Sequence, residues 1–298
     1  MNGFICLNKP EGLTSFVAAA KCRRLTGAKK SGHTGTLDPM ATGVLVVALG
    51  AATRFIELIP SHEKSYRAVF RLGETTDTLD ITGRVLRSSP VNCTKEDVAA
   101  ALEHFRGEID QVPPMYSALQ KDGVRLYTLA RQGVEIERPA RCVTIFHLSL
   151  VAADDAAHTY TIDVTCSAGT YIRSLIADLG ALLGCGAVMT ALCRTGAHGL
   201  TLEDSFTFSD LESMGENGTL SKAILPTERL LALPGLTVSE KQSVRFSNGG
   251  ALDRGRLQGA AENGLYSVFS PSGVFLGVGE AVENELKVRK TISKTTSE

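Results

Sequence analysis

The sequence lacks any segment that could act as a membrane anchor or a secretion signal. Its 298 residues contain no apolar stretch near the length of a membrane span, and the run from Val44 to Leu49 is far too short. The first residues, MNGF, show no basic region followed by an apolar stretch. We therefore expect a cytoplasmic protein that makes no use of a membrane.

Close pairs of metal-binding side chains are also missing. The seven cysteines are scattered without a C-x-x-C pair, which favours free thiols in a reducing compartment over disulfides or zinc. The six histidines show no spacing typical of metal ligands either. We therefore expect no metal site, and no cofactor motif stands out.

Net charge is low, at −1, so the chain is not expected to coat nucleic acid indiscriminately. Its positive charges nevertheless fall into three clusters: Lys21, Arg23, Arg24, Lys29 and Lys30; then Lys121, Arg125, Arg131, Arg138 and Arg141; and finally Lys287, Arg289, Lys290 and Lys294. Any one such cluster is usually a solvated surface. The first leads directly into a candidate active loop, which favours a phosphate-rich partner.

That loop is the most informative segment present. It reads GHTGTLDPMATG over residues 32–43, and its single carboxylate, Asp38, lies among three glycines, a histidine and a proline. Glycine permits unusual backbone conformations and lets a ligand approach the main chain closely, while Pro39 biases Asp38 toward an extended conformation. We expect Asp38 on an irregular loop beside a buried strand, as either a structural turn or a functional carboxylate.

Hydrophobic periodicity predicts a mixture of strands and helices. Strands are expected near residues 4–8, 44–49, 66–72 and 160–166. Helices are expected over 14–26, 94–109 and 172–183, with capping residues at their starts and glycines after the first and the last. Because these elements do not alternate regularly, they indicate an α+β fold with a mainly antiparallel sheet.

The chain is expected to divide into two domains at a hinge, Leu233-Pro234-Gly235. Residues 1–233 would form the larger domain. Residues 234–298 would form a small β-rich domain with a short helix from Ser239 and strands near 265–269 and 274–282. From Lys290 onward we expect a frayed tail.

Four further segments give the chain a specific resemblance. They are LNKPEGLTS at 7–15, KSYRA at 64–68, VPPMYSAL at 112–119 and GTYIRSL at 169–175. Together with the Asp38 loop they closely resemble the bacterial tRNA pseudouridine-55 synthase family, the TruB family, over roughly residues 3–210. The resemblance implies a pseudouridine synthase catalytic domain, a C-terminal module of the PUA type, and a monomer. It also implies isomerisation of a T-arm uridine of tRNA to pseudouridine, without metal or cofactor.

The resemblance assigns the chemistry to three residues. Asp38 would be the catalytic nucleophile on a uridine flipped out of its stack. Tyr66 would pack on the flipped uracil, although a tyrosine in such a strand is otherwise a core aromatic. Arg173 would be the counter-charge of Asp38 and hold it by two hydrogen bonds, unless it is an exposed arginine in the first turn of its helix.

Other residues are expected to bind the RNA or support the loop. His33 would insert into the RNA, and it is otherwise an ordinary loop histidine. Tyr171 and Leu192 would line the base pocket, while Lys9 and Pro10 would pack beside the active loop. Residues 121–141 correspond to a mobile lobe that closes over the RNA in relatives.

Some features leave alternatives open. Gln120, Ala168 and Cys193 occupy places where relatives often carry Lys or Arg, so RNA binding is expected to be weaker or more sensitive to salt. The scaffold could also serve a non-catalytic RNA-binding protein or a tRNA folding chaperone. An aspartate-dependent hydrolase is disfavoured because Asp77 and Asp80 fit a turn better than a second catalytic acid.

Overall fold

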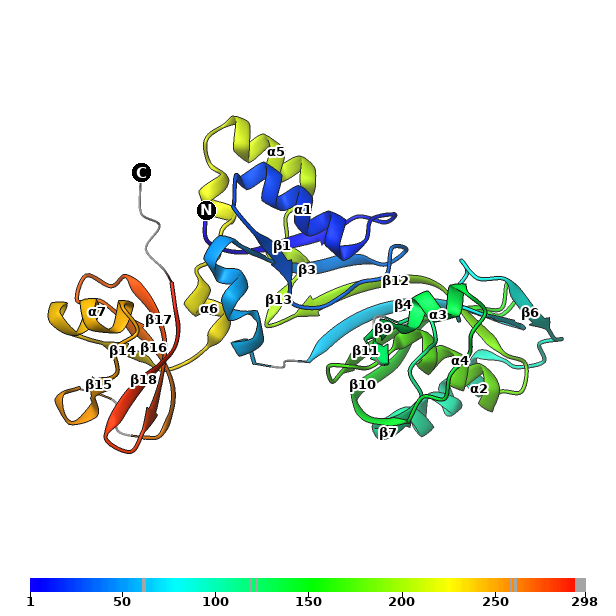
Figure 1. Ribbon diagram of the computed structural model, residues 1–298. Helices are drawn as coiled ribbons and strands as arrows, with labels where there is room; N and C mark the ends of the chain where they lie inside the picture. Colours follow the sequence, from blue (N-terminus) through cyan, green and yellow to red (C-terminus); the bar gives the residue numbers. More distant parts are fainter. Residues whose placement is uncertain (61–62, 118, 122, 258, 260–261, 293–298) are drawn as a thin grey trace.

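The computed structural model describes residues 1–60, 63–117, 119–121, 123–257, 259 and 262–292. Two main sheets organise this part of the chain, a large one built between Gly3 and Thr201 and a small one built between Gly235 and Thr291. The small sheet lies beyond the end of the large sheet that contains β1 and β13 (Figure 1). Across these ranges, no helix is long and apolar enough to span a membrane.

The large sheet has nine strands, and its central path runs β1-β3-β12-β4-β11-β10-β7, with β2 beside β3 and β13 beside β12. The strands are β1 Gly3–Lys9, β2 Ser31–His33, β3 Thr42–Leu49, β4 Lys64–Leu72, β7 Gly107–Gln111, β10 Arg141–Asp154, β11 Thr159–Cys166, β12 Ala187–Ala197 and β13 Leu200–Thr201. Of these pairings only β12 with β3 is parallel. The predicted α+β fold with a mainly antiparallel sheet is therefore confirmed.

One face of the large sheet is covered by helices. These are α1 Ser15–Thr26, α2 Lys95–Leu102, α4 Ile172–Leu182 and α5 Phe208–Glu216, and all four contribute buried side chains to one apolar core. The Thr14 side chain caps α1, and Gly27 ends it in the left-handed conformation, as the sequence predicts. Helix α4 buries Leu175, Ile176 and Leu179 against the sheet, which fixes the orientation of its first turn.

The helix predicted over 94–109 is too long. The Thr94 capping box is present, but α2 ends at Leu102 and is followed by a single 3₁₀ turn, η2 Glu103–Phe105. Gly107 then takes a φ of +84°, which a right-handed helix cannot accommodate, and β7 begins there. Ile109 still packs against the core, but it does so from a strand.

On the other face, a second apolar cluster forms at the β1–β3 end of the sheet. Phe4, Val44 and Val46 pack there against the 3₁₀ segment η1, Gly50–Leu58. Phe55 from η1 meets Phe275 of the small sheet, with ring centroids 5.6 Å apart. The two sheets therefore share a buried contact across the predicted hinge.

The small sheet follows the order β14-β16-β17-β18-β15 and packs against one helix. Its elements are β14 Gly235–Thr237, α7 Glu240–Ser247, β15 Leu252–Asp253, β16 Gly264–Phe269, β17 Phe275–Val282 and β18 Glu285–Thr291. None of the strands predicted from the sequence corresponds to β18. Lys290 belongs to this strand and pairs with Glu57 at 2.5 Å, so the prediction of fraying from Lys290 is wrong for the residues up to Thr291.

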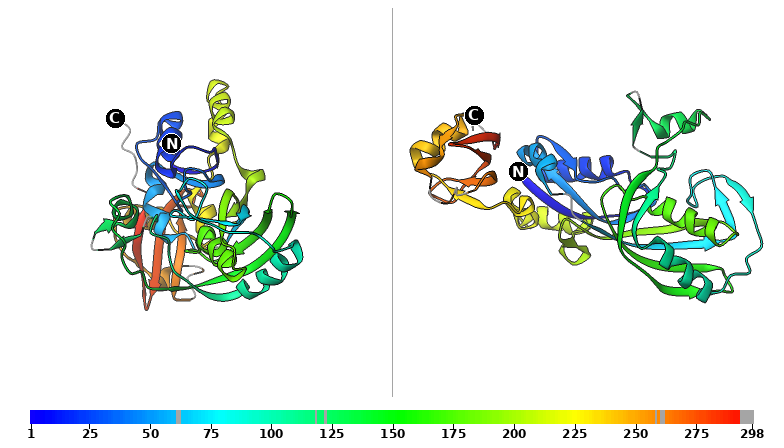
Figure 2. Two further views of the ribbon diagram at one scale, coloured as in Figure 1. Left: turned by 90° about the vertical axis from the view of Figure 1, so that its right-hand side faces the viewer. Right: turned by 90° about the horizontal axis from the view of Figure 1, so that it is seen from below.

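Short elements complete the chain: β5 Glu74–Thr76, β6 Val85–Ser88, β8 Gln120–Lys121, β9 Val124–Arg125, α3 Leu126–Arg131, η3 Leu202–Asp204, η4 Leu220–Ala223, α6 Thr227–Leu231 and η5 Arg254–Arg256. The β8–β9–α3 unit lies within the predicted lobe and projects away from the large sheet (Figure 2, right). The side chains of Gln120, Lys121, Arg125 and Arg131 and the whole of Lys294 lie outside the described part.

Candidate active site

Asp38 lies on an irregular loop between β2 and β3, and this loop is held in place by Lys9, before α1, and by Ser15, the first residue of α1. The Ser15 hydroxyl accepts a hydrogen bond from the Leu37 amide at 2.7 Å and donates one to the Leu37 carbonyl at 3.0 Å. Lys9 is completely buried. Its Nζ donates to three backbone carbonyls, those of Pro10 at 2.8 Å, Leu13 at 2.8 Å and Pro39 at 3.3 Å. Burial lowers the pKa of Lys9 to about 8, and the nearby Asp38 opposes that shift.

Arg194 holds the same loop from the other side, and the sequence analysis gave it no role. Only 1% of it is exposed, and its guanidinium donates to the carbonyls of Val44 at 2.6 Å, Thr36 at 3.4 Å and Gly35 at 3.3 Å. A Cβ on Gly43 would lie 2.2 Å from the Arg194 carbonyl, so this close approach requires glycine. The signal in the sequence is an arginine two residues after Leu192, on the inward face of β12.

Arg173 contacts Asp38, as proposed from the sequence. Its Nη2 lies 2.9 Å from Asp38 Oδ2 and 2.8 Å from the carbonyl of Tyr116. The expected two-point grip on one carboxylate is wrong. Arg173 Nη1 instead approaches Asp80 Oδ2 at 3.5 Å and donates to the Thr78 carbonyl at 2.9 Å. Only 5% of Arg173 is exposed, so it is not the surface arginine of the alternative interpretation.

Asp80 belongs to a turn, as predicted, but it also joins this charged group. Its Oδ1 accepts from the hydroxyls of Thr78 and Thr82, while its Oδ2 approaches Arg173. Only 4% of the residue is exposed. Sequence reasoning missed this contact because nothing in the spacing relates the turn at residues 77–83 to α4.

The charge state of Asp38 follows from three opposing influences. Burial raises the pKa of the Asp38 carboxyl above its usual range, Arg173 lowers it, and Asp80 raises it again. The net direction is upward. The carboxylate is thus harder to ionise than an ordinary aspartate, and Arg173 is the largest influence that favours its charged form.

Two cavities meet at Asp38. The smaller, about 290 Å³, is lined by Asp38, Arg173 and three residues predicted from the sequence, Tyr66, Tyr171 and Leu192. Its size and its aromatic walls suit a single pyrimidine ring. Burial raises the pKa of Tyr66, so its hydroxyl stays protonated at neutral pH.

The larger cavity, about 750 Å³, lies on the other side of the Asp38–Arg173 pair. His33 lines this cavity rather than the smaller one, together with the exposed Phe16. Burial and the positive charge of Arg194 lower the pKa of His33, so the ring is uncharged at neutral pH. Pro10 lines neither cavity and contributes its carbonyl to Lys9.

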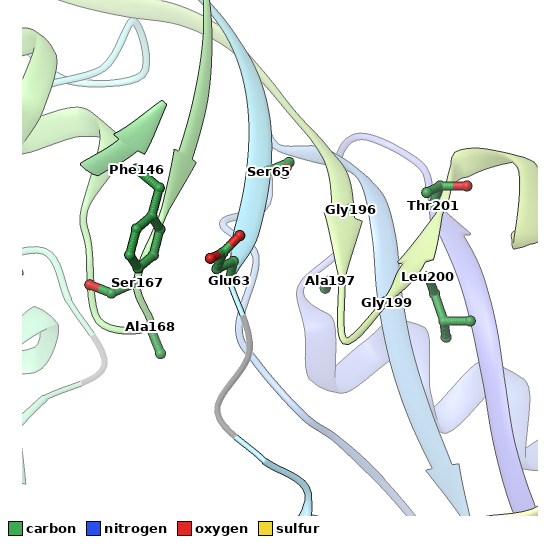
Figure 3. A pocket seen from close by; sticks show the side chains of 10 residues that line it. All are labelled: Glu63, Ser65, Phe146, Ser167, Ala168, Gly196, Ala197, Gly199, Leu200 and Thr201. Atoms are coloured by element: carbon green, nitrogen blue, oxygen red, sulfur yellow. The ribbon is translucent and has the colours of Figure 1, made fainter. Parts of the chain in front are cut away.

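A third hollow, about 590 Å³, lies between the start of β4 and the β12–β13 hairpin (Figure 3). Ser65 lines it, and alternation along β4 places Ser65 on the face opposite Tyr66. Among the described residues that line it, only Glu63 is ionisable. Ala168, one of the departures noted above, lines this hollow. Across the described residues, no three His, Cys, Asp or Glu side chains are grouped as a metal ion would require.

Comparisons with known proteins identify the family. The TruB family pseudouridylate synthase N-terminal domain matches residues 23–172, and the tRNA pseudouridylate synthase B C-terminal domain matches residues 173–232. The chain is 43% identical to the tRNA pseudouridine synthase B of Pseudomonas syringae pv. syringae (strain B728a) over 288 residues, which cover 95% of this chain and 93% of the relative. It is 43% identical to the protein of the same name from Clostridium perfringens (strain 13 / Type A), over 98% of this chain and 99% of the relative.

A solved structure supports the same assignment. The chain aligns with one chain of the crystal structure of a Cbf5-Nop10-Gar1 complex with a TM-score of 0.73 and 26% identity, over 98% of this chain and 85% of that chain. Both family domains, the relatives and the fold agree. The chain therefore belongs to the TruB family of pseudouridine synthases and is an isomerase.

Proposed function

We propose that the chain converts the uridine at position 55, in the T-arm of tRNA, to pseudouridine, with Asp38 as the nucleophile. The observation that carries this proposal is the placement of the Asp38 carboxylate. It lies at the boundary of a cavity of pyrimidine size, in contact with the buried Arg173. A carboxylate at that boundary can reach the junction of sugar and base while the ring occupies the cavity.

The reaction conserves all atoms of the nucleotide. The C1′–N1 bond breaks, the uracil turns over, C1′ bonds to C5, and the proton lost from C5 is balanced by one gained at N1. Asp38 would assist the cleavage as a carboxylate, so Arg173 must keep it ionised despite burial. These steps need a positioned carboxylate, an enclosed cavity and no external reactant.

The substrate uridine would be flipped out of its stack, at a cost of roughly a few kcal/mol. Tyr66 would stack on the ring, with Tyr171 and Leu192 closing the cavity around it. His33, uncharged and lining the adjacent cavity, would take the place of the flipped base in the RNA. Lys9 and Pro10 would support the loop that carries Asp38.

The remaining assignments follow from the same proposal. Residues 1–233 would be the catalytic domain, with 121–141 as a lobe that clamps the RNA, and 234–298 would be a PUA-like RNA-binding domain. The protein would act as a cytoplasmic monomer whose partner is tRNA.

The direct test is incubation of the protein with unmodified tRNA, followed by mapping of pseudouridine at single-nucleotide resolution. We expect modification at position 55, and none by the Asp38→Asn variant. Modification at another site would contradict the assigned position. Tight tRNA binding without modification would instead favour a chaperone.

A further inference from the structure

Ser117 is a buried hydroxyl without a protein partner of suitable geometry. Only 4% of the residue is exposed, and its Oγ makes no hydrogen bond within the described chain. The Tyr171 hydroxyl is its polar neighbour: Ser117 offsets part of the rise that burial causes in the Tyr171 pKa, although the two hydroxyls do not meet hydrogen-bond geometry. Buried polar atoms are nearly always satisfied, and an unsatisfied one is costly. The missing partner of Ser117 is therefore to be sought in a ligand.

The position of Ser117 indicates which part of a ligand it meets. Five residues line both cavities at Asp38 and so form the wall between them: Thr36, Leu37, Asp38, Ser117 and Arg173. Arg173 fixes the chain beside Ser117, because its Nη2 donates to the Tyr116 carbonyl at 2.8 Å. The same guanidinium holds Asp38. Ser117 and Asp38 are thus held in a fixed relation by one side chain.

The wall is where the sugar of a bound nucleotide must lie. The smaller cavity, about 290 Å³, accommodates a pyrimidine ring but not a whole nucleotide. With the ring in the smaller cavity, the ribose would lie where this cavity meets the larger one, with the phosphates beyond it. A ribose 2′-hydroxyl can both donate and accept a hydrogen bond, as a serine hydroxyl can.

We propose that Ser117 is a specificity-determining residue whose hydroxyl bonds to the 2′-hydroxyl of the target nucleotide. This inference rests on the proposed function, since it takes the occupant of the smaller cavity to be the target uracil. Ser117 would select ribose over deoxyribose at one position, independently of any recognition of the rest of the RNA. The test is therefore a comparison of two RNAs that differ in one oxygen atom.

The experiment measures the affinity for two T-arm stem-loops, one with uridine and one with 2′-deoxyuridine at the target position. The Asp38→Asn variant serves as the parent, because it keeps both RNAs unreacted. We expect the parent to bind the uridine RNA about three- to tenfold more tightly, the range for one net hydrogen bond. Adding Ser117→Ala should bring this ratio of affinities close to one, because it weakens binding of the uridine RNA alone.

Ser174→Ala is the matched control, because Ser174 is equally buried but its hydroxyl already donates to the Val112 carbonyl at 3.2 Å. It should leave the ratio unchanged. The proposal would be overturned if the parent bound both RNAs equally well. It would also be overturned if Ser117→Ala left the ratio of affinities unchanged, or weakened the binding of both RNAs equally. Pseudouridine formation by the unaltered chain, measured in parallel, tests the proposed function separately.

Discussion

The smaller cavity at Asp38 differs in character from the hollow between β4 and the β12–β13 hairpin, which Phe146 also lines, and volume does not reveal the difference. The hollow is about twice as large, 590 Å³ against 290 Å³, and it carries an exposed aromatic ring. The cavity instead brings a carboxylate and a buried guanidinium together at its wall. Buried charges are expensive to maintain, so their presence is better evidence of a site than volume is.

The strands explain why the two hollows differ. Alternate residues of β4 face opposite sides of the sheet, so Tyr66 faces the helices and Ser65 faces away. On the Tyr66 side, α4 and the loop before β3 supply Arg173 and Asp38. On the Ser65 side the neighbouring ion pair, Arg67 with Asp163, is solvent-exposed and geometrically regular. Substitutions matched across the sheet can test this difference.

The largest effect is expected from Asp38→Asn, which should abolish pseudouridine formation while RNA affinity changes by less than about tenfold, or 1.4 kcal/mol. The change keeps the shape of the side chain and removes the nucleophile. Single-turnover assays with deamidation excluded provide the measurement. Glu63→Gln, the matched change in the other hollow, should leave the rate unaltered. Equal losses in both variants would remove the distinction between the hollows.

Arg173→Lys should lower the single-turnover rate by about a hundredfold, the order expected when one positioned electrostatic contact of an active site is lost. One ammonium cannot reach Asp38, Asp80 and the Thr78 carbonyl at once. Arg67→Lys is the control, because it alters a bidentate pair whose arginine side chain is 56% exposed. A rate near that of the unaltered chain for Arg173→Lys would show that the paired geometry is not needed.

A smaller effect is expected on the pH dependence of the rate. Burial raises the pKa of Asp38, so activity should fall with acidity at a higher pH than for an ordinary aspartate. Asp80 contributes to that rise in the Asp38 pKa. Asp80→Asn should therefore move the acidic limb of the pH–rate profile to lower pH. Arg173→Gln should move it upward, since it removes the largest opposing charge. If the rate fell at the same acidic pH in the unaltered chain, in Asp80→Asn and in Arg173→Gln, ionisation of Asp38 would not control the rate.

The smallest effect is expected from Phe146→Ala. The side chain is 53% exposed and takes no part in the buried cores, so both the thermal stability and the modification rate should change little. A marked loss of tRNA affinity, measured by filter binding, would give the hollow beside Phe146 a role that its lack of buried charge does not suggest.

Local signals in the sequence predicted much of the fold and part of the candidate site. The Thr14 and Gly27 caps and the apolar stripe of α4 depend on nearby residues, and each appears where it was expected. The prediction of one helix over 94–109 was wrong because an apolar spacing that fits a long helix also fits a short helix followed by a strand. The contacts of Arg194 and Asp80 join residues far apart in the chain, so no local pattern in the sequence predicts them.

The support of the Asp38 loop has a consequence for synthesis of the protein. Lys9 is synthesised before the Asp38 loop. Arg194, which donates to the Val44 carbonyl just after that loop, follows Val44 by 150 residues. A nascent chain still lacking β12 therefore has its candidate nucleophile on a loop without the support of Arg194. Competence for RNA modification should appear abruptly during translation, when Arg194 leaves the ribosome and can pack, and not gradually as the sheet grows.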